Sequence, residues 1–439
     1  MKWTSPKASA CSLITAIVAT SILANLAQAQ VSSPRTEPSA ENVSTNPPPE
    51  QAPEKTPLMA ALAPTPIGKG LEAARIDIYG WLQGSYQYNF NRPFNAASGR
   101  YENNGRTYDF FQHDVGYLNQ ADLNIERKVE TNSTAFDVGG HVEAMFGTDA
   151  FFTHSYGLLD HETTSHGLYQ LDLLQAYVDV AVPVGSGIRI RAGKFEFVKP
   201  INPNARLFYT DTFAYHGSFP FTVTGITATY WFAPNLSVES GISRGWNVSV
   251  KDNNGSIDGL ARVVWQIAPD KRFTAGLIAG PELPHNSSHW TTALDIGYSQ
   301  NVTDNFAIFF DAVFNAQAGA PLGTPPGTPA PARVPATVSH ANYYGVSADA
   351  LYQFNELLAL GGRFEWLRDE EGYLTGVASV DLYDATLGLT ITPFYATPMG
   401  KNILIRPELR YDYASIPLFY PSPGKYGQFT FAIDLIINF

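Results

Sequence analysis

The last segment of the chain, Gln428 to Phe439, alternates between apolar and more polar side chains. One set is Phe429, Phe431, Ile433, Leu435, Ile437 and Phe439, and the other is Gln428, Thr430, Ala432, Asp434, Ile436 and Asn438. Because successive side chains of a β-strand point to opposite faces, this period of two predicts a strand with one apolar face. Asn402 to Tyr413 repeats the pattern, and the polar side carries four charges in a row, Arg406, Glu408, Arg410 and Asp412. Such a face needs water.

Alternating runs of roughly ten to thirteen residues recur from residue 76 to the end. They predict sixteen strands, at 76–90, 118–129, 135–147, 171–182, 186–196, 222–232, 235–246, 259–268, 272–280, 290–299, 304–315, 342–354, 357–367, 380–392, 402–413 and 428–439. Short links mostly follow the even strands and long links the odd ones. This segregation favours an all-β, transmembrane, antiparallel up-and-down β-barrel with short periplasmic turns and long external loops, because a soluble sandwich has no reason to collect long loops at one end.

The composition agrees with a barrel. Charged residues make up only 15% of the chain and aromatic residues 13%. No apolar run of about 20 residues follows residue 30, which excludes a helical membrane protein. The net charge of −12 argues against a nucleic-acid partner, which would select a basic surface. Hydrocarbon tolerates no open strand edge, so a membrane sheet must close, and sixteen strands would enclose an aqueous lumen.

The N-terminal region differs from the rest. A basic start, an apolar stretch from Cys11 to Leu26 and the small-x-small sequence Ala27-Gln28-Ala29 predict a signal peptide over residues 1–29. Cys11 stands at the start of the apolar stretch, whereas a lipid-anchor cysteine would follow it, and this order disfavours a lipid anchor. Residues 30–72 are rich in proline and are expected to form a disordered periplasmic linker. The barrel is predicted over residues 73–439, and without the signal peptide it contains no cysteine.

Several short motifs stand in an order that is typical of one family. They are Gly80-Trp81, Tyr88-Asn89-Phe90-Asn91-Arg92-Pro93, Leu174-Gln175-Ala176-Tyr177-Val178, Ala192-Gly193-Lys194-Phe195, Gly245-Trp246-Asn247 with Asp252-Asn253-Asn254-Gly255, and Pro407-Glu408-Leu409-Arg410-Tyr411-Asp412. On these motifs the chain resembles the OmpL-like β-barrel porins of Gram-negative outer membranes, over residues 76–439. The resemblance implies an outer-membrane channel and leaves the solute open. The terminal Phe439 resembles the signal that the barrel assembly machinery reads.

Charged residues on the polar side of the predicted strands are the candidate pore lining. They are Asp122, Glu126, Glu143, Arg189, Arg191, Arg363, Glu365, Arg406, Glu408, Arg410 and Asp412. Opposite charges on facing walls would create a transverse field that filters ions. An equally weighted alternative is that the four charges of 406–412 only neutralise one another along one wall.

The third external loop, 196–221, is a candidate constriction. In classical sixteen-stranded porins this loop folds inward, and by analogy its charged and titratable residues would narrow the pore. They are Lys199, Arg206, Asp211 and His216.

No motif in the sequence predicts catalysis, a metal or a cofactor. His161 and His166 are five residues apart, whereas a zinc helix places its histidines four apart. Asp252-Asn253-Asn254-Gly255 with Asp258 has calcium-like oxygen ligands but lacks the distal Glu of an EF-hand, so a tight turn is favoured. Gly68-Lys69-Gly70 is too short for a phosphate loop.

The sequence therefore predicts a Gram-negative outer-membrane porin, not an enzyme, that lets small hydrophilic solutes or ions diffuse through a water-filled lumen. A substrate-selective channel for sugars, anions or peptides, a structural or adhesive barrel, and a lipase-like barrel remain alternatives. The expected partners are outer-membrane lipids, the barrel assembly machinery, small solutes and further copies of the chain in a homo-oligomer.

Overall fold

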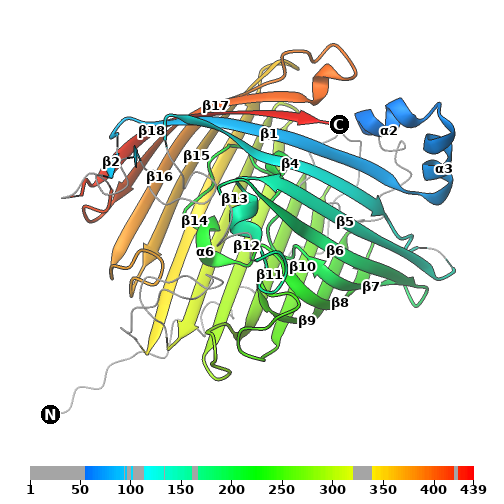
Figure 1. Cartoon of the computed structure of the whole chain (residues 1–439), viewed down its shortest axis with the longest axis horizontal. Coiled ribbons are helices and arrows are strands. Elements are labelled where there is room, and N and C mark those ends of the chain that lie inside the picture. The colour runs from blue at the N-terminus through cyan, green and yellow to red at the C-terminus, as the bar shows by residue number, and fades with distance from the viewer. Residues whose placement is uncertain are drawn as a thin grey trace. The chain divides into compact units, whose positions relative to one another are not determined.

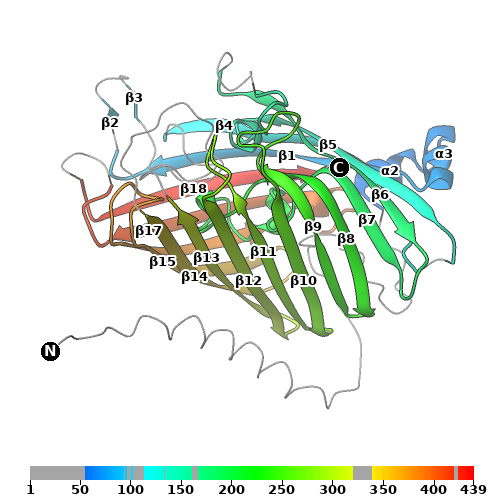
Figure 2. The same cartoon turned by 90° about the horizontal axis from the view of Figure 1, so that it is seen from below.

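The computed structural model describes residues 55–92, 94–95, 100–101, 113–132, 134–160, 167–319, 339–419 and 424–439. Sixteen strands of this part close into one antiparallel barrel (Figures 1 and 2). They are β1 (Asp77–Asn89), β4 (Val115–Arg127), β5 (Asp137–Gly147), β6 (Gln170–Val182), β7 (Ile188–Phe195), β8 (Val223–Ala233), β9 (Leu236–Trp246), β10 (Asp258–Ala268), β11 (Lys271–Pro281), β12 (Trp290–Thr303), β13 (Phe306–Ala318), β14 (His340–Gln353), β15 (Leu358–Asp369), β16 (Val380–Ile391), β17 (Ile403–Ala414) and β18 (Gly427–Asn438). Every predicted strand is confirmed, with ends displaced by a few residues.

Each barrel strand is hydrogen-bonded to its neighbours in chain order, and β1 pairs with β18 to close the sheet. A separate short hairpin, β2 (Phe94–Asn95) with β3 (Arg100–Tyr101), lies in the first loop. The backbone N–H of Gly80 donates to the carbonyl of Phe439 at 3.1 Å, and the N–H of Phe439 donates to the carbonyl of Gly80 at 2.9 Å. The start of the barrel and the chain terminus therefore meet at one rim, which also carries the short turns.

The alternation of the sequence separates the two faces of the wall. On β18, Phe429 is 39% exposed and points outward, whereas Thr430 and Asp434 are buried on the inside. On β17, Leu409 and Tyr411 are exposed and the four charges of 406–412 are buried. The outer wall is thus apolar and aromatic and the inner wall polar, as a barrel in hydrocarbon requires.

Two helices precede the barrel, α2 (Pro57–Leu62) and α3 (Pro66–Ala74). Each begins with a Thr-Pro pair, in which the Thr hydroxyl accepts a backbone N–H and the Pro occupies the first turn. In α3 the Thr65 hydroxyl accepts from the N–H of Gly68 at 3.0 Å. The expectation of disordered chain is therefore wrong for residues 57–72, because the same prolines that break helices elsewhere are compatible with a helix start. The helices lie near the barrel rim that holds the C-terminus (Figure 1).

Arg75 joins α3 to the barrel. It adopts a left-handed conformation with φ 55° just after the helix, and the N–H of Ile76 donates back to the carbonyl of Leu71 at 2.9 Å. Its guanidinium donates to both carboxylate oxygens of Asp137 at 2.7 Å, at the start of β5. A charged contact therefore fixes the helix end against the rim.

The remaining short elements lie between strands, and they are α4 (Ala150–Thr153), η1 (Pro203–Ala205), α6 (Tyr215–Ser218) and η2 (Gly400–Asn402). Among the residues described, no helix is long and apolar enough to cross a membrane. The predicted signal peptide, residues 30–54 of the predicted linker, and the stretch from His161 to His166 lie outside the described residues.

Candidate functional site: the inner wall and loop L3

The connection between β7 and β8, residues 196–222, runs inside the barrel, and we call it L3. Its backbone is bound by charged side chains of the inner wall of β17. The carboxylate of Glu408 accepts hydrogen bonds from the N–H of Tyr209 at 2.8 Å and of Thr210 at 3.3 Å. Arg406 donates to the carbonyl of Pro203 at 3.0 Å. The predicted inward fold of the third loop is therefore present in the structure.

Neighbouring strands continue this attachment. On β15, Arg363 donates to the carbonyl of Thr210 at 2.8 Å, and Glu365 accepts from the N–H groups of Phe213 and Ala214, both at 2.7 Å. On β13, Asn315 donates to the carbonyl of Ser218 at 3.2 Å. Backbone groups taken from water must find partners, and in L3 the wall side chains supply them.

The first half of L3 is tied to other sides of the barrel. Arg262 of β10 donates to the carbonyl of Phe197 at 2.8 Å. Lys199 contacts Asp295 of β12 at 3.0 Å and Asp311 of β13 at 2.7 Å. Asn204 is hydrogen-bonded at 2.8 Å to Asn438 at the end of β18. L3 therefore crosses the interior from β10–β13 to β17–β18 before it returns along β15 and β13.

Close packing of L3 depends on two glycines of the wall. A Cβ atom at Gly361 of β15 would lie 3.1 Å from the ring of Phe208, and one at Gly388 of β16 would lie 3.0 Å from it. The Arg363 guanidinium lies 5.1 Å from the centroid of the same ring. The absence of side chains at these two positions lets the loop approach the sheet.

Carboxylates neutralise the arginines of the inner wall. Arg406 donates to Asp434 at 2.9 and 2.5 Å, Arg363 donates to Asp384 at 2.8 Å, and Arg410 donates to Asp412 at 2.6 Å. Further pairs join Arg262 to Glu239 at 2.7 Å and Arg191 to Asp179 at 2.9 Å. Such pairing is necessary because a buried charge without a partner carries a desolvation cost of several kcal/mol.

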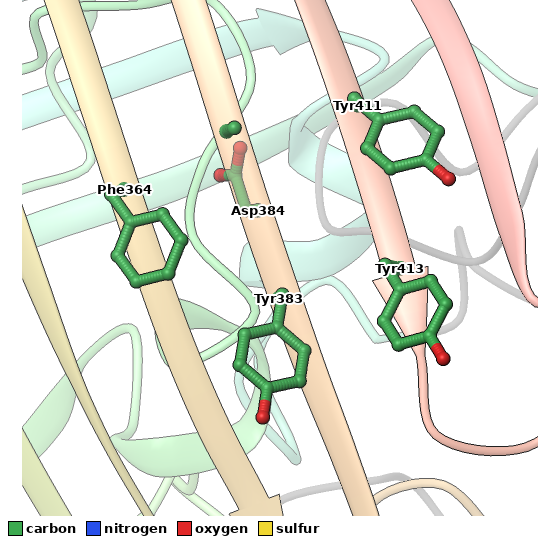
Figure 3. A pocket seen from close by; sticks show the side chains of 6 residues that line it. Phe364, Tyr383, Asp384, Tyr411 and Tyr413 are labelled. Carbon is green, nitrogen blue, oxygen red and sulfur yellow. The ribbon is translucent and has the colours of Figure 1, made fainter.

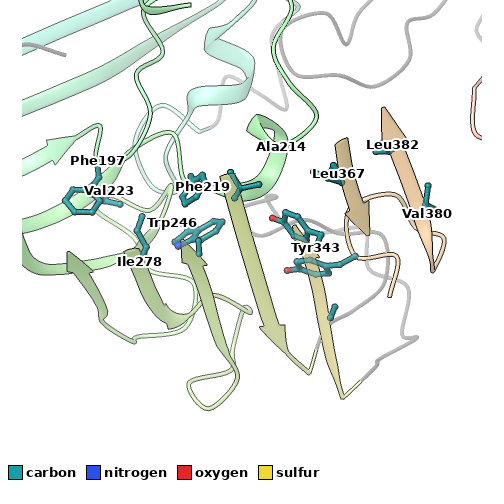
Figure 4. Packing of buried hydrophobic residues seen from close by; sticks show 14 of the residues in the cluster. Phe197, Ala214, Phe219, Val223, Trp246, Ile278, Tyr343, Leu367, Val380 and Leu382 are labelled. Carbon is teal, nitrogen blue, oxygen red and sulfur yellow. The ribbon is translucent and has the colours of Figure 1, made fainter. Parts of the chain in front are cut away.

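Apolar side chains fill the interior next to the external loops (Figure 4). Phe197 and Phe219 of L3 belong to the same cluster as Trp246, Ile278 and Tyr343 from the ends of β9, β11 and β14. The cluster lies at the strand ends nearest the long loops. The charged wall side chains that bind the L3 backbone lie deeper in the barrel. L3 is thus held by two kinds of contact, apolar burial and hydrogen bonds to charged groups.

The structure places all eleven predicted pore-lining residues on the inner face. Nine of them are buried, and Glu126 and Arg191 are partly exposed. Besides the contacts above, Glu126 accepts from Tyr79 at 3.1 Å, Glu143 from Gln175 at 2.6 Å and Asp122 from Asn124 at 2.5 Å, and Arg189 donates to Thr229 at 3.2 Å. Their contact with permeating solutes stays a prediction.

The four constriction candidates do not gather at one point. Lys199 bridges to β12 and β13, and Arg206 and Asp211 form an ion pair of 2.8 Å within L3. His216 lies in α6, near the end of the loop. Burial alone would lower the pKa of Lys199, but the carboxylates of Asp295 and Asp311 outweigh it and raise the pKa above its ordinary value. Lys199 is therefore a charged cross-link between L3 and the wall.

Several members of the site were not predicted, among them Glu239, Arg262, Asp295, Asp311, Asp384 and Asp434. All six lie on the inward side of their strands. The alternation that selected Arg406 and Glu408 would also have found them, had it been applied equally to every strand.

The outer wall has a shallow depression over β15, β16 and β17. The rings of Phe364, Tyr383, Tyr411 and Tyr413 border it (Figure 3), and the small side chain of Ala385 also lines it. Ala385 pairs with Phe364 on one side and with Tyr411 on the other. The depression faces outward, away from L3, and belongs to the apolar belt.

Of the two motifs with metal-ligand residues, 252–258 lies within the described residues, whereas 161–166 does not. Within the described ranges, no three or more His, Cys, Asp or Glu side chains gather to hold a metal ion. The carboxylate of Asp252 accepts from the N–H of Asn254 at 2.9 Å and of Gly255 at 2.7 Å, which confirms the tight turn.

Comparison with known structures gives the same architecture. The outer-membrane channel DcaP of Acinetobacter baumannii aligns with a TM-score of 0.54 and 13% identity, covering 83% of this chain and 97% of its own. The anion-selective porin from Comamonas acidovorans aligns with a TM-score of 0.53 and 9% identity, covering 83% and 99%. A loop L8 deletion mutant of OmpT of Vibrio cholerae gives 0.51 and 10%, also covering 83% and 99%. At these identities the likeness shows the fold.

A family model supplies the assignment. A search of curated protein sequences finds no match. The model described as "Putative beta-barrel porin-2, OmpL-like" matches residues 75–439, which is the whole barrel. This family and the structural neighbours are channels rather than enzymes. The chain belongs to the OmpL-like family of β-barrel porins and forms a channel in the outer membrane of a Gram-negative bacterium.

Proposed function

We propose that small hydrophilic solutes diffuse passively through this barrel along the inner wall of β11–β14, beside L3. The observation that carries the proposal is the uneven cover of the inner face. On most strands the inward side chains are buried, whereas the periplasmic halves of β11–β14 keep partly exposed polar residues. They are Arg272, Thr274, Ser299, Asn301, Asp311 and Asp349.

The mixed charge of this surface supports the proposed passage of small polar solutes. Asp311, 31% exposed, carries negative charge, and Arg272 and Lys199 carry positive charge nearby. A wall with both signs and several neutral hydroxyl and amide groups can replace parts of a hydration shell without a tight site. This arrangement favours diffusion over saturable binding.

Cysteine accessibility tests the path. The only cysteine of the chain is Cys11, within the predicted signal peptide. We would purify Ser299→Cys, measure single-channel current in a planar bilayer, and add a charged methanethiosulfonate reagent. Val302→Cys, on the same strand but facing lipid and 45% exposed, is the matched control. Ser347→Cys, on the inner face but only 8% exposed, tests whether covered positions stay unreactive.

The proposal expects modification of Ser299→Cys to reduce the current, while the other two variants keep theirs. Ohmic current that stays unchanged after complete labelling of the Ser299→Cys variant would place the path elsewhere. A folded protein that never conducts would favour the structural or adhesive barrel instead.

The sign of selectivity depends on Lys199. Changing Lys199 to Met leaves Asp295 and Asp311 without their cation, so the reversal potential in a salt gradient should shift toward cations. Lys271→Met, at a periplasmic turn and 39% exposed, is the matched control and should leave it unchanged.

Self-association belongs to this proposal too. OmpT of Vibrio cholerae, one of the structural neighbours, has been solved in a trimer form. That likeness supports a homo-oligomer of this chain. Cross-linking in native membranes would show a ladder above the monomer band, and a monomer alone would contradict it.

A further inference from the structure

Two carboxyl groups stand together where the fourth and fifth external loops leave the barrel. Asp258 is the first residue of β10, after loop L4 (247–257), and Glu282 follows the last residue of β11 and begins loop L5 (282–289). Asp258 pairs in register with Ser243 of β9, and Gly280 of β11 lies on its other side. All of these residues lie at the external end of adjacent strands.

The oxygen atoms at this place are buried and lack donors. Asp258 is 1% exposed, and neither of its carboxylate oxygens accepts a hydrogen bond from an N–H or O–H group among the described residues. The Ser243 hydroxyl, the Asn253 side-chain oxygen and Glu282 Oε1 are in the same condition. Glu282 Oε2, in contrast, accepts a hydrogen bond from the N–H of Trp246 at 3.0 Å. A native interior rarely leaves so many acceptors unsatisfied in one place.

The two carboxyl groups lie within hydrogen-bonding reach of each other. No ion pair joins either of them to a basic side chain among the described residues, and the nearby Arg244 pairs with Asp252 at 3.8 Å instead. Burial and the neighbouring Asp258 raise the pKa of Glu282 well above its ordinary value. Two buried negative charges in contact require either a shared proton or a cation.

Glycines make the room for these groups. A Cβ atom at Gly280 would lie 1.8 Å from Asp258 Oδ1. Gly245, with φ +119°, would place a Cβ atom 3.4 Å from Glu282 Oε1. L4 is also fastened to L5, since Asn253 donates to the Glu282 carbonyl at 3.1 Å and Asn254 to the Pro281 carbonyl at 2.6 Å. The chain thus builds a fixed, oxygen-lined space.

We propose that Asp258 and Glu282 bind a divalent cation, Ca²⁺ from the external medium, with the oxygens of Ser243 and Asn253 as neutral ligands. A hard cation prefers carboxylate, hydroxyl and amide oxygens, which are the kinds of oxygen that these four residues carry. With two carboxylates the affinity is modest, with a Kd of about 10⁻⁴ to 10⁻³ M, as in extracellular calcium modules. The ion would join L4 and L5 to the barrel rim.

Terbium luminescence tests the site in the refolded full chain. Tb³⁺ replaces Ca²⁺ and is excited by tryptophan, and the Trp246 backbone contacts Glu282 directly. We expect saturable emission that Ca²⁺ displaces, and at least tenfold weaker Ca²⁺ competition in Asp258→Asn and Glu282→Gln. Asp304→Asn, an exposed residue of a periplasmic turn, is the matched control and should behave as the parent. Trp246→Phe should lose emission while calorimetry still detects Ca²⁺ binding.

A second variant separates loss of the site from loss of the fold. Gly280→Ala keeps both carboxylates but displaces Asp258, so it should weaken Ca²⁺ binding while the heat-modifiable gel band of the folded barrel persists. Absence of Ca²⁺-displaced emission in the parent chain, or unchanged binding in Asp258→Asn, would overturn the proposal. The shared proton would then be the correct account, and Glu282→Gln would raise the thermal stability without added calcium.

Discussion

Glu408 of β17 and Tyr209 of L3 are joined by a hydrogen bond of 2.8 Å between a wall carboxylate and a loop N–H. The same carboxylate also accepts the N–H of Thr210. One wall residue therefore holds two consecutive backbone groups of the loop. The position of L3 in the lumen depends on charges that the strands carry, in addition to the apolar contacts of the loop itself.

Replacing Glu408 by Gln should loosen L3, because the amide retains one acceptor oxygen and no charge. A hydrogen bond to a charged group contributes about 1.5–3 kcal/mol, so the free energy of unfolding in urea should fall by a similar amount. Single-channel recordings should show larger and noisier currents. Glu356→Gln, in an exposed periplasmic turn, should reproduce the parent in both measurements.

Arg406 and Asp434 form a buried bidentate pair between β17 and β18. Arg406→Met should lower the free energy of unfolding by about 3–5 kcal/mol, since it leaves the carboxylate uncompensated. The double variant with Asp434→Asn removes that charge and should lose less than Arg406→Met alone. Urea titrations of both singles and the double give the coupling free energy, and strict additivity would show that the pair is not coupled.

Stability should depend on Asp149 in weakly acidic solution. This residue lies in the loop after β5, and burial raises its pKa to about 6, although Arg206, Gln120 and Asn119 act in the opposite direction. The folded state therefore holds a proton that the unfolded chain releases near pH 4, and stability is greatest below that pH and falls as the pH rises to about 6.

In Asp149→Asn this contribution, on the order of 1–3 kcal/mol, should disappear. The free energy of unfolding measured at several pH values between 4 and 7 would then be flatter than in the parent. Equal slopes in the two proteins would assign the pH dependence to other groups.

Gly80 should be intolerant of a side chain. A Cβ atom there would lie 2.1 Å from the carbonyl oxygen of Asp122 and 2.8 Å from the ring of Phe439. Gly80→Ala should displace the terminal ring and reduce the yield of heat-modifiable folded barrel several-fold. Gly362→Ala, in a strand position with open space around it, should fold like the parent.

The strands could be predicted because each one separates lipid from the lumen. Apolar outward and polar inward side chains therefore alternate along its sequence. The helices of residues 57–74 could not, because proline content alone does not distinguish a helix start from irregular chain. The hydrogen bonds that hold the L3 backbone against the wall could not be predicted either. Glu365 accepts hydrogen bonds from the backbone N–H groups of Phe213 and Ala214. Because nearly every residue carries a backbone N–H, the sequence does not show which of them a wall carboxylate binds.

The charges of 406–412 show where pattern reasoning stops. The alternatives were a transverse field and mutual neutralisation along one wall. In the structure the four residues have different partners. Arg410 and Asp412 neutralise each other, and Arg406 pairs with Asp434 on the next strand. Glu408 accepts hydrogen bonds from the L3 backbone. Alternation fixes the face on which a side chain lies, whereas its partner depends on register and on L3.

The pairing of Gly80 with Phe439 closes the barrel by joining its first strand to its last. Joining ends so far apart costs about 5 kcal/mol of chain entropy before any contact across the seam forms. Every intermediate that lacks this pairing exposes two strand edges to other chains. The pairing of β18 with β1 is therefore a step that controls the kinetics of assembly. Until it forms, the sheet stays open and prone to mispairing.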